Sequence, residues 1–149
     1  MKYLNNFHNN NLIITLCDKS QETYDFISKY LDTISYADYI ENSNLFQVCC
    51  YDSTKLVGLR VFRMKDNKIH LNYTAIEPEY RSLGINQMML DKIVEVAKQE
   101  SVVLITSNVR QSNTKSIESL LSSGFSINDK VDMTYPDGEK KIPMYYKIN

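Results

Sequence analysis

The segment from residue 68 to residue 99 limits the possible folds more than any other part of the chain. Lys68 to Ile76 has the alternation of a β-strand, and Asn86 to Gln99 carries apolar residues at helical spacing. A short turn that contains Pro78 and Gly84 joins the two. At such a turn the first N–H groups of the helix lack acceptors and point the same way, at the positive end of the helix dipole. The segment therefore predicts a site for a phosphate or pyrophosphate group.

Two residues of the turn support this prediction. Gly84 has no side chain to obstruct a close approach, and Arg81 adds a fixed positive charge. The turn lacks both the Gly-Lys-Ser/Thr of a P-loop and the GxGxxG of a dinucleotide-binding fold. The alternative interpretation is an ordinary strand-to-helix turn with an arginine on the surface.

Length and charge exclude several classes of protein. At 149 residues the chain is expected to form a single domain, residues 1–149, whose core needs no disulfide or metal. The formal net charge of -1 argues against nucleic-acid binding. No apolar run is long enough to span a membrane, and the N-terminus lacks the apolar core of a signal peptide. We therefore expect a cytoplasmic monomer or homodimer with no nucleic-acid or membrane partner.

The number and spacing of the cysteines do not indicate a disulfide framework. Cys17, Cys49 and Cys50 are three in number, and the adjacent pair cannot easily bridge. Neither His8 nor His70 lies near a Cys-x-x-Cys, so no metal site is expected. We expect the cysteines to act as small apolar residues, two of them within a strand.

The remaining patterns predict an alternation of strands and helices without repeats or linkers. In chain order the expected elements are an irregular arm (1–11), a strand (12–16), two helices (one with its N-cap among Asp18, Lys19 and Ser20, one over 32–40), three antiparallel strands (45–51, 56–64 and 68–76), a helix (about 82–99), a strand buried on both faces (102–105), a helix capped by Ser112 or Asn113 and ended by Gly124, and a hairpin (125–135 and 142–148).

The turn and this order together resemble the GNAT superfamily of acyl-CoA-dependent N-acetyltransferases. The family's pyrophosphate loop reads Val-x-Pro and then Arg/Gln-x-x-Gly-x-Gly/Ala, which Ile76-Glu77-Pro78 and Arg81-Ser82-Leu83-Gly84-Ile85-Asn86 match. Asn86 is the one departure, and its side chain would crowd the pyrophosphate. The resemblance implies an α/β (mixed α+β) GNAT fold, with a mixed, mostly antiparallel sheet of about seven strands and about four helices.

The resemblance also implies a set of residues that bind acetyl-CoA (coenzyme A) as co-substrate, without a metal. The backbone of Ala75 and Ile76 would contact the pantetheine amides or the thioester oxygen, and residues 102–106 would form the opposite wall. Asn113 would contact a cofactor amide, or it serves only as a helix cap. The loop residues expected to bind the cofactor are Arg81, Ser82, Leu83, Gly84, Ile85 and Asn86.

His70 is the candidate catalytic residue. Several family members carry Glu or His six residues before the Val of Val-x-Pro, and His70 holds that position. An imidazole can take a proton from an amine near neutral pH, and strand alternation would place Asn72 and Thr74 on its face to hold a water. The alternative is that His70 is only a surface or half-buried strand residue.

The proton donor departs from the family pattern. Asn113 and Gly124-Phe125 match the last helix of the family, but Leu120 stands where the family usually has tyrosine. A leucine cannot protonate a thiolate. The other candidate donors are water and the hydroxyl groups of Ser116, Ser119, Ser123 and Tyr73.

The resemblance implies an N-acetyltransferase that moves an acetyl group from acetyl-CoA to a primary amine. The region after the first strand and the last hairpin would frame the acceptor pocket, and their acidic and aromatic residues would suit a cationic amine. These residues are Tyr36, Asp38, Tyr39, Glu41, Tyr135, Tyr145 and Tyr146. The alternatives are a catalytically impaired CoA-binding regulatory module and an interaction protein that keeps only the scaffold.

Overall fold

The computed structural model describes residues 11–31 and 34–149. The irregular arm expected over residues 1–11 lies outside the described residues, apart from Asn11. The strands are β1 (Leu12–Leu16), β2 (Leu45–Asp52), β3 (Lys55–Lys65), β4 (Lys68–Ile76), β5 (Leu104–Arg110), β6 (Ser126–Ile127), β7 (Met133–Thr134) and β8 (Lys140–Lys147). The helices are α1 (Gln21–Tyr30), α2 (Tyr36–Glu41), α3 (Ile85–Gln99) and α4 (Thr114–Ser122), with a 3-10 turn η2 (Pro78–Tyr80).

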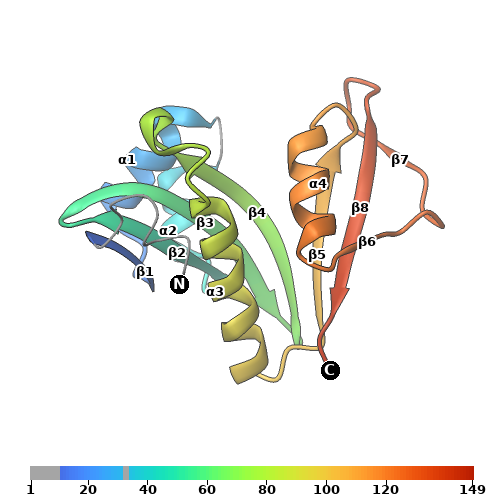
Figure 1. The fold of residues 1–149 in the computed structure, drawn as a ribbon, viewed down its shortest axis with the longest axis horizontal. Helices are drawn as coiled ribbons and strands as arrows, with labels where there is room; N and C mark the ends of the chain where they lie inside the picture. Colours follow the sequence, from blue (N-terminus) through green and yellow to red (C-terminus); the bar gives the residue numbers. More distant parts are fainter. Residues whose placement is uncertain (1–10, 32–33) are drawn as a thin grey trace.

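The strands form one mixed sheet in the order β1-β2-β3-β4-β5-β8-β6, with β7 paired to β8 (Figure 1). Only β4 and β5 run parallel; the other pairs within the described residues are antiparallel. The predicted mixed, mostly antiparallel sheet with four helices is confirmed. None of the described helices has the length and apolar character needed to cross a bilayer.

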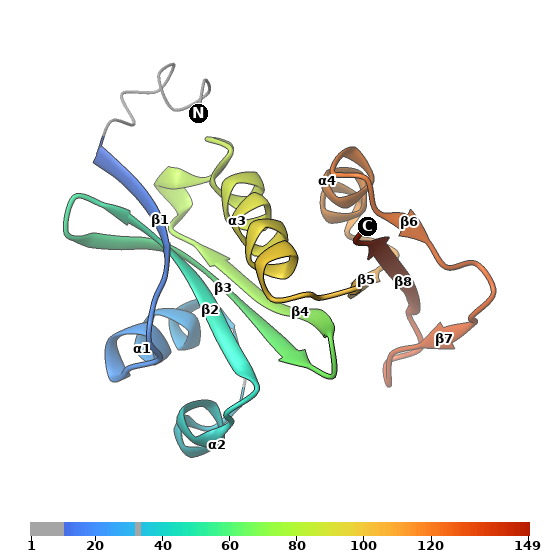
Figure 2. The same cartoon turned by 90° about the horizontal axis from the view of Figure 1, so that it is seen from below.

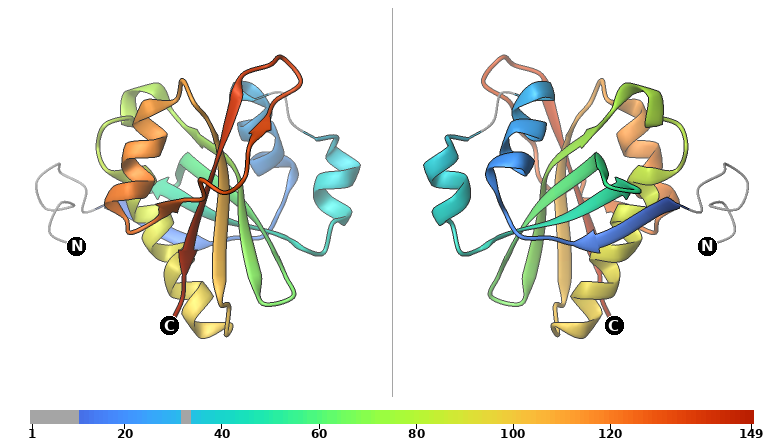
Figure 3. Two further views of the ribbon diagram at one scale, coloured as in Figure 1. Left: turned by 90° about the vertical axis from the view of Figure 1, so that its right-hand side faces the viewer. Right: turned by 90° about the vertical axis from the view of Figure 1, so that its left-hand side faces the viewer.

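The helices cover the sheet in two layers. Helices α1 and α2 lie on one face, and α3 and α4 lie on the other (Figures 2 and 3). Each face has its own apolar cluster: Phe26 and Tyr39 belong to the first, and Met89 and Leu120 belong to the second. Strand alternation divides β2 in the same way, since Cys49 packs under α1 while Cys50 packs under α3.

Several predicted boundaries were wrong. The helix predicted over 32–40 begins at Tyr36, behind its cap Ser35, and residues 32–33 of that prediction lie outside the described residues. Helix α3 begins at Ile85 instead of about Ser82, because Gly84 adopts a left-handed φ of 83° that cannot continue into a helix. The strand predicted over 102–105 lies at Leu104–Arg110, and its exposure alternates instead of being buried on both faces. The strand predicted over 125–135 is reduced to β6 and β7, two residues each, with a loop between them.

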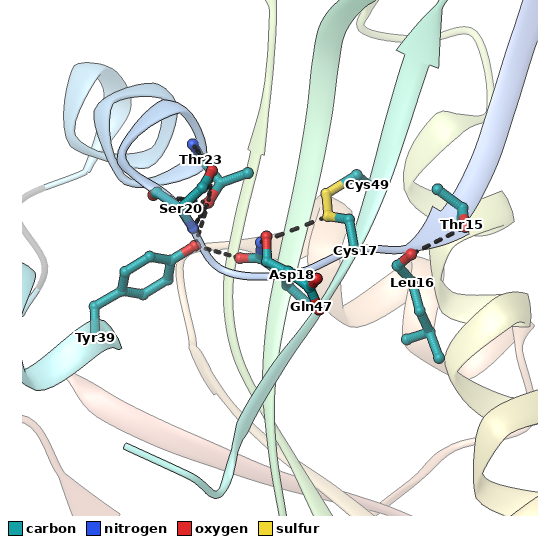
Figure 4. Close-up of a disulfide and its surroundings, with 9 residues drawn as sticks. All are labelled: Thr15, Leu16, Cys17, Asp18, Ser20, Thr23, Tyr39, Gln47 and Cys49. Atoms are coloured by element: carbon teal, nitrogen blue, oxygen red, sulfur yellow. Dashed lines mark hydrogen bonds between the residues drawn. A yellow bond between two sulfur atoms is a disulfide. The ribbon is translucent and has the colours of Figure 1, made fainter. Parts of the chain in front are cut away.

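The expectation of unpaired cysteines was also wrong. Cys17 and Cys49 form a disulfide (Figure 4). Antiparallel pairing of β1 with β2 places Thr15 opposite Cys49, so Cys17 follows just beyond this pair. Such a bridge depends on strand pairing between distant segments, which cysteine spacing does not reveal. Cys50 is free and buried, and desolvation raises the pKa of its thiol to about 12.

Candidate active site

Strands β4 and β5 pair at one end and diverge at the other (Figure 1). The pairing runs from Lys68 opposite Leu104 to Leu71 opposite Ser107, and no further. Beyond it β4 continues to Ile76 against β3 alone. A β-bulge accompanies the divergence, because Val61 opposes Tyr73 whereas Phe62 opposes Leu71, which leaves Asn72 as the extra residue.

The open edge of β4 presents backbone groups toward the divergence. The N–H of Glu77 donates to the carbonyl of Val57 on β3 at 2.9 Å. In an antiparallel pair successive residues face alternately toward and away from the partner strand, so Ala75 faces β3 while Thr74 and Ile76 face the open edge. The Nε of Arg81 donates to the Ile76 carbonyl at 3.1 Å, which agrees with this orientation. Of the two backbone positions expected to contact the cofactor, Ile76 is therefore the one that faces the gap.

The loop between β4 and α3 is held in an unusual backbone conformation. The Tyr80 hydroxyl donates to Asp52 at 2.5 Å and fixes η2 against the end of β2. Both Ser82 (φ 65°) and Gly84 (φ 83°) adopt left-handed conformations. Within the described residues no acceptor contacts the backbone N–H groups of residues 82–87. The loop thus collects unpaired donors at the start of a 15-residue helix, as an anion site requires.

The side chains of the loop differ in their surroundings. Ile85 is buried against the sheet, where a Cβ on Gly58 would come within 3.2 Å of its Cγ2. Leu83 is half-buried against the same apolar cluster. Arg81 is exposed, with its guanidinium carbon 5.9 Å from the ring centre of Tyr30. The loop is therefore anchored by its apolar residues and leaves the arginine at the surface.

The Asn86 side chain turns into the protein instead of toward the loop. Its Oδ1 accepts a hydrogen bond from Nη1 of Arg60, a β3 residue that lies beneath the first turn of α3. Arg60 is 6% exposed and is the only buried charged side chain among the described residues. Desolvation lowers its pKa to about 10, so the guanidinium remains charged at neutral pH.

His70 lies on the face of the sheet that carries α1 and α2. It opposes Arg63 on β3 and Thr106 on β5. Its Nδ1 is 2.8 Å from the Thr106 Oγ1. Desolvation lowers the pKa of His70, and the positive charges of Arg63 and Lys141 lower it further. The imidazole is therefore mostly neutral at pH 7 and able to accept a proton.

The bulge changes which residues share a face with His70. Thr74 was expected beside it, but Thr74 opposes Arg60 and so faces α3. The extra residue at Asn72 shifts the alternation by one, and Tyr73 and Ala75 join the cluster under α1 and α2. The predicted pairing of His70 with Thr74 was wrong for this reason.

The α4 side contains serines but no tyrosine at the expected position. Leu120 is buried in the apolar cluster. Ser123 reaches across to α3, where its hydroxyl lies 2.9 Å from the Gln87 Oε1. Asn113 caps α4 by accepting from the N–H of Ser116 at 3.2 Å. Its cap role is thus observed, and its contact with a cofactor stays a prediction.

Two hollows lie on the His70 face and share Thr106. One of about 280 Å³ is lined by His70, by basic residues of β3 and β4, and by Asp66 of the turn between these strands. The other, of about 350 Å³, is lined by Tyr145 and the chain after β6. The Tyr39 ring is only 2% exposed, and its hydroxyl contacts Thr23 and Gln47 (Figure 4). Tyr146 stacks on Phe125 in the opposite layer. Tyr145 is therefore better placed for an acceptor than these two.

Sequence reasoning did not identify Arg60 as a site residue, and it included Thr106 only in the wall expected over residues 102–106, without a contact to His70. A single arginine in the apolar run from Leu56 to Val61 was a usable signal, because a charge within a buried strand needs a reason. No local signal marked Thr106, since its contact with His70 depends on parallel pairing of two distant strands.

Comparison with known proteins agrees with this geometry. The Acetyltransferase (GNAT) family matches residues 13–125. No curated protein matches the chain. Among solved structures, the ribosomal-protein-S18-alanine N-acetyltransferase from Escherichia coli is 18% identical, with a TM-score of 0.74 over 92% of this chain and 95% of that one.

Two further structures have the same fold. A GNAT family acetyltransferase from Elizabethkingia anophelis with acetyl-CoA bound is 15% identical, with a TM-score of 0.74 over 93% of this chain and 99% of that one. The spermidine/spermine N-acetyltransferase SpeG from Vibrio cholerae is 15% identical, with a TM-score of 0.73 over 90% of this chain and 92% of that one. The family match spans most of the chain and includes the diverging strands and the loop. The chain belongs to the GNAT acetyltransferase family.

Proposed function

We propose that this protein moves the acetyl group of acetyl-CoA to a primary amine, and that His70 takes the proton from that amine. The observation that carries the proposal is the divergence of β4 from β5, with the unpaired N–H groups of residues 82–87 at its open end. The divergence gives an extended thioester a path between the faces of the sheet. The unpaired donors give its pyrophosphate a place to bind.

The residues of the loop fit this co-substrate. Ser82, Leu83, Gly84, Ile85 and Asn86 would offer backbone N–H groups to the pyrophosphate, and Arg81 would add an exposed charge. Acetyl-CoA supplies the acetyl group as an activated thioester. Backbone groups at the open edge of β4 would bind the pantetheine amides and hold the thioester beside His70.

The hydrogen bonds of His70 favour the tautomer that a base needs. The Thr106 Oγ1 lies 3.5 Å from the carbonyl of Ile69 and 2.8 Å from Nδ1 of His70. When the hydroxyl donates to the carbonyl, it accepts from Nδ1–H. The lone pair then resides on Nε2, which is free to accept a proton from the acceptor amine.

The acceptor would reach His70 from the α1/α2 face, where Arg63, Lys65, Lys68 and Lys141 outnumber the single carboxylate of Asp66. Arg63 and Lys141 both lower the pKa of His70, so both act on the space that the amine enters. Positive charges there help keep the amine unprotonated, and they repel a polycation. We therefore propose a monoamine, or an amine that also carries an acid group, as acceptor. The S18-alanine and spermidine enzymes support an amine acceptor in general, and the second marks the polyamine class that these charges disfavour.

Thiol release from acetyl-CoA with a panel of amines tests this function. Release with an amino acid or peptide amine that exceeds release with spermidine, and that falls in His70→Gln, is the expected result. Tight binding of acetyl-CoA without release for any amine would support the regulatory module instead. Absence of acetyl-CoA binding would support the interaction protein.

A further inference from the structure

The buried Arg60 has no negative partner in the part of the chain that the structure describes. Its Nη1 donates to Asn86, its Nε has no acceptor, and no carboxylate forms an ion pair with it within the described residues. Burial of a charge without a counterion is costly, and buried charges are normally paired. An apolar side chain of similar volume at this position in β3 would avoid that cost. The unpaired guanidinium therefore calls for an explanation beyond packing.

The position of Arg60 makes the charge more costly still. Asn86 is the second residue of α3, so its partner Arg60 lies beside the positive end of the helix dipole. Two positive features thus share one end of α3, together with the unpaired N–H groups of the loop. An anion bound at the loop would satisfy all three at once.

Asn86 connects the guanidinium to the loop. GNAT loops usually carry Gly or Ala at this position, where a side chain would crowd the pyrophosphate. Here the Asn86 amide turns down to Arg60, which leaves its backbone N–H uncovered. The residue that departs from the family pattern, Asn86, is therefore the one that binds the buried arginine.

We propose that Arg60 and Asn86 form an anion-recognition pair beneath the loop, in which the buried charge of Arg60 strengthens binding of the pyrophosphate of acetyl-CoA. The proposal rests on the proposed function for the identity of the anion. Arg60 acts through the field of its charge and through Asn86, so it is a positioning residue. A buried charge is screened little by salt, in contrast to the exposed Arg81.

The test is Arg60→Met, titrated calorimetrically with CoA and, separately, with pantetheine, which lacks the pyrophosphate. The dissociation constant for CoA is expected to rise about tenfold to a hundredfold, while binding of pantetheine is unchanged. The melting temperature without ligand is expected to stay the same or rise, because an uncompensated charge has been removed. Arg63→Met is the matched control, an exposed arginine on the opposite face of β3, and its affinity for CoA should match the unaltered protein.

Unchanged affinity of Arg60→Met for CoA would overturn the proposal. An equal loss for CoA and pantetheine, together with a lower melting temperature, would also overturn it, since that is the result of a purely structural role. If the Met variant does not fold, Arg60→Lys replaces it. Affinity for CoA within about threefold of the unaltered protein supports a charge effect, and a larger loss in a folded Lys variant contradicts it.

The failure of the proposed function would look different. If the unaltered protein does not bind CoA, the proposed function fails. Inorganic pyrophosphate then serves as the probe. If the unaltered protein binds pyrophosphate and Arg60→Met abolishes this binding, the anion site stands without acetyl-CoA. If the unaltered protein does not bind pyrophosphate, the anion-site proposal fails as well.

Discussion

The Nδ1 atom of His70 and the Oγ1 atom of Thr106 lie 2.8 Å apart, one residue pair before β4 and β5 diverge. The contact joins the two strands from which the site is built. It directs Nδ1 toward β5 and leaves Nε2 on the other side of the ring. The proposed base and the proposed opening for the thioester thus depend on the same strand pairing.

Replacing Thr106 by Val removes the hydroxyl while keeping the shape of the side chain. We expect kcat to fall about tenfold, as for a base that has lost its orienting partner, with the KM for acetyl-CoA unchanged. Thr106→Ser restores the hydroxyl and should recover most of the rate. Steady-state kinetics of the three proteins make the comparison. Equal rates in the Val and Ser variants would show that the hydroxyl has no part in catalysis.

The pH dependence of kcat/KM should report His70. Burial and the charges of Arg63 and Lys141 lower the pKa of His70 below its ordinary 6.5, so the rate should rise with pH through a midpoint below that value. Arg63→Met removes one positive charge and should move the midpoint upward. His70→Gln should remove this limb. A limb that survives in the Gln variant belongs to another group.

The same shift makes a prediction about stability. The folded state binds fewer protons than the unfolded state between the lowered pKa and the ordinary pKa of His70. The free energy of unfolding should therefore fall as the pH drops through this interval below about 6.5. Denaturant titrations of the unaltered protein and His70→Gln at pH 7 and pH 5 measure it. The fall should be smaller in the variant.

Local patterns allowed much of this fold to be predicted, and the long-range contacts were missed. The turn with Pro78 and Gly84 could be read because a strand, a turn and a helix follow one another in the chain. The bridge from Cys17 to Cys49 and the contact between Thr106 and His70 depend on which strands pair, which no local pattern states. A single extra residue at Asn72 was enough to reverse the predicted face of the next residues.

Ser123 is one candidate donor to the thiolate, and its hydroxyl donates from α4 across to Gln87 of α3 at 2.9 Å. If it does so, Ser123→Ala should lower kcat by roughly 10² without changing affinity for acetyl-CoA. Ser122→Ala is the matched control. Ser122 and Ser123 each donate to the backbone carbonyl four residues earlier, but Ser122 is exposed. Rates that are equal in the two variants would exclude Ser123 and leave water, Ser116, Ser119 and Tyr73 as donors.

Two glycines allow the loss of the pyrophosphate site to be distinguished from the effect of backbone strain. Gly84 and Gly138 both have left-handed φ, 83° and 91°, but Gly138 lies in the turn before β8, with nothing within 4 Å of an added Cβ. Valine at either position should destabilise the fold by about 1–2 kcal/mol through the same strain. Only Gly84→Val also places atoms where the pyrophosphate would lie.

Calorimetric titration of the unaltered protein, Gly84→Val and Gly138→Val with acetyl-CoA is the most direct test of the central claim. The account predicts one site per chain in the unaltered protein and in Gly138→Val, with affinities that agree within about twofold. It predicts a loss of at least about tenfold in Gly84→Val, or about 1.4 kcal/mol of binding free energy. No binding to the unaltered protein, or equal binding by both glycine variants, would contradict the assignment of residues 82–87 as the acetyl-CoA site.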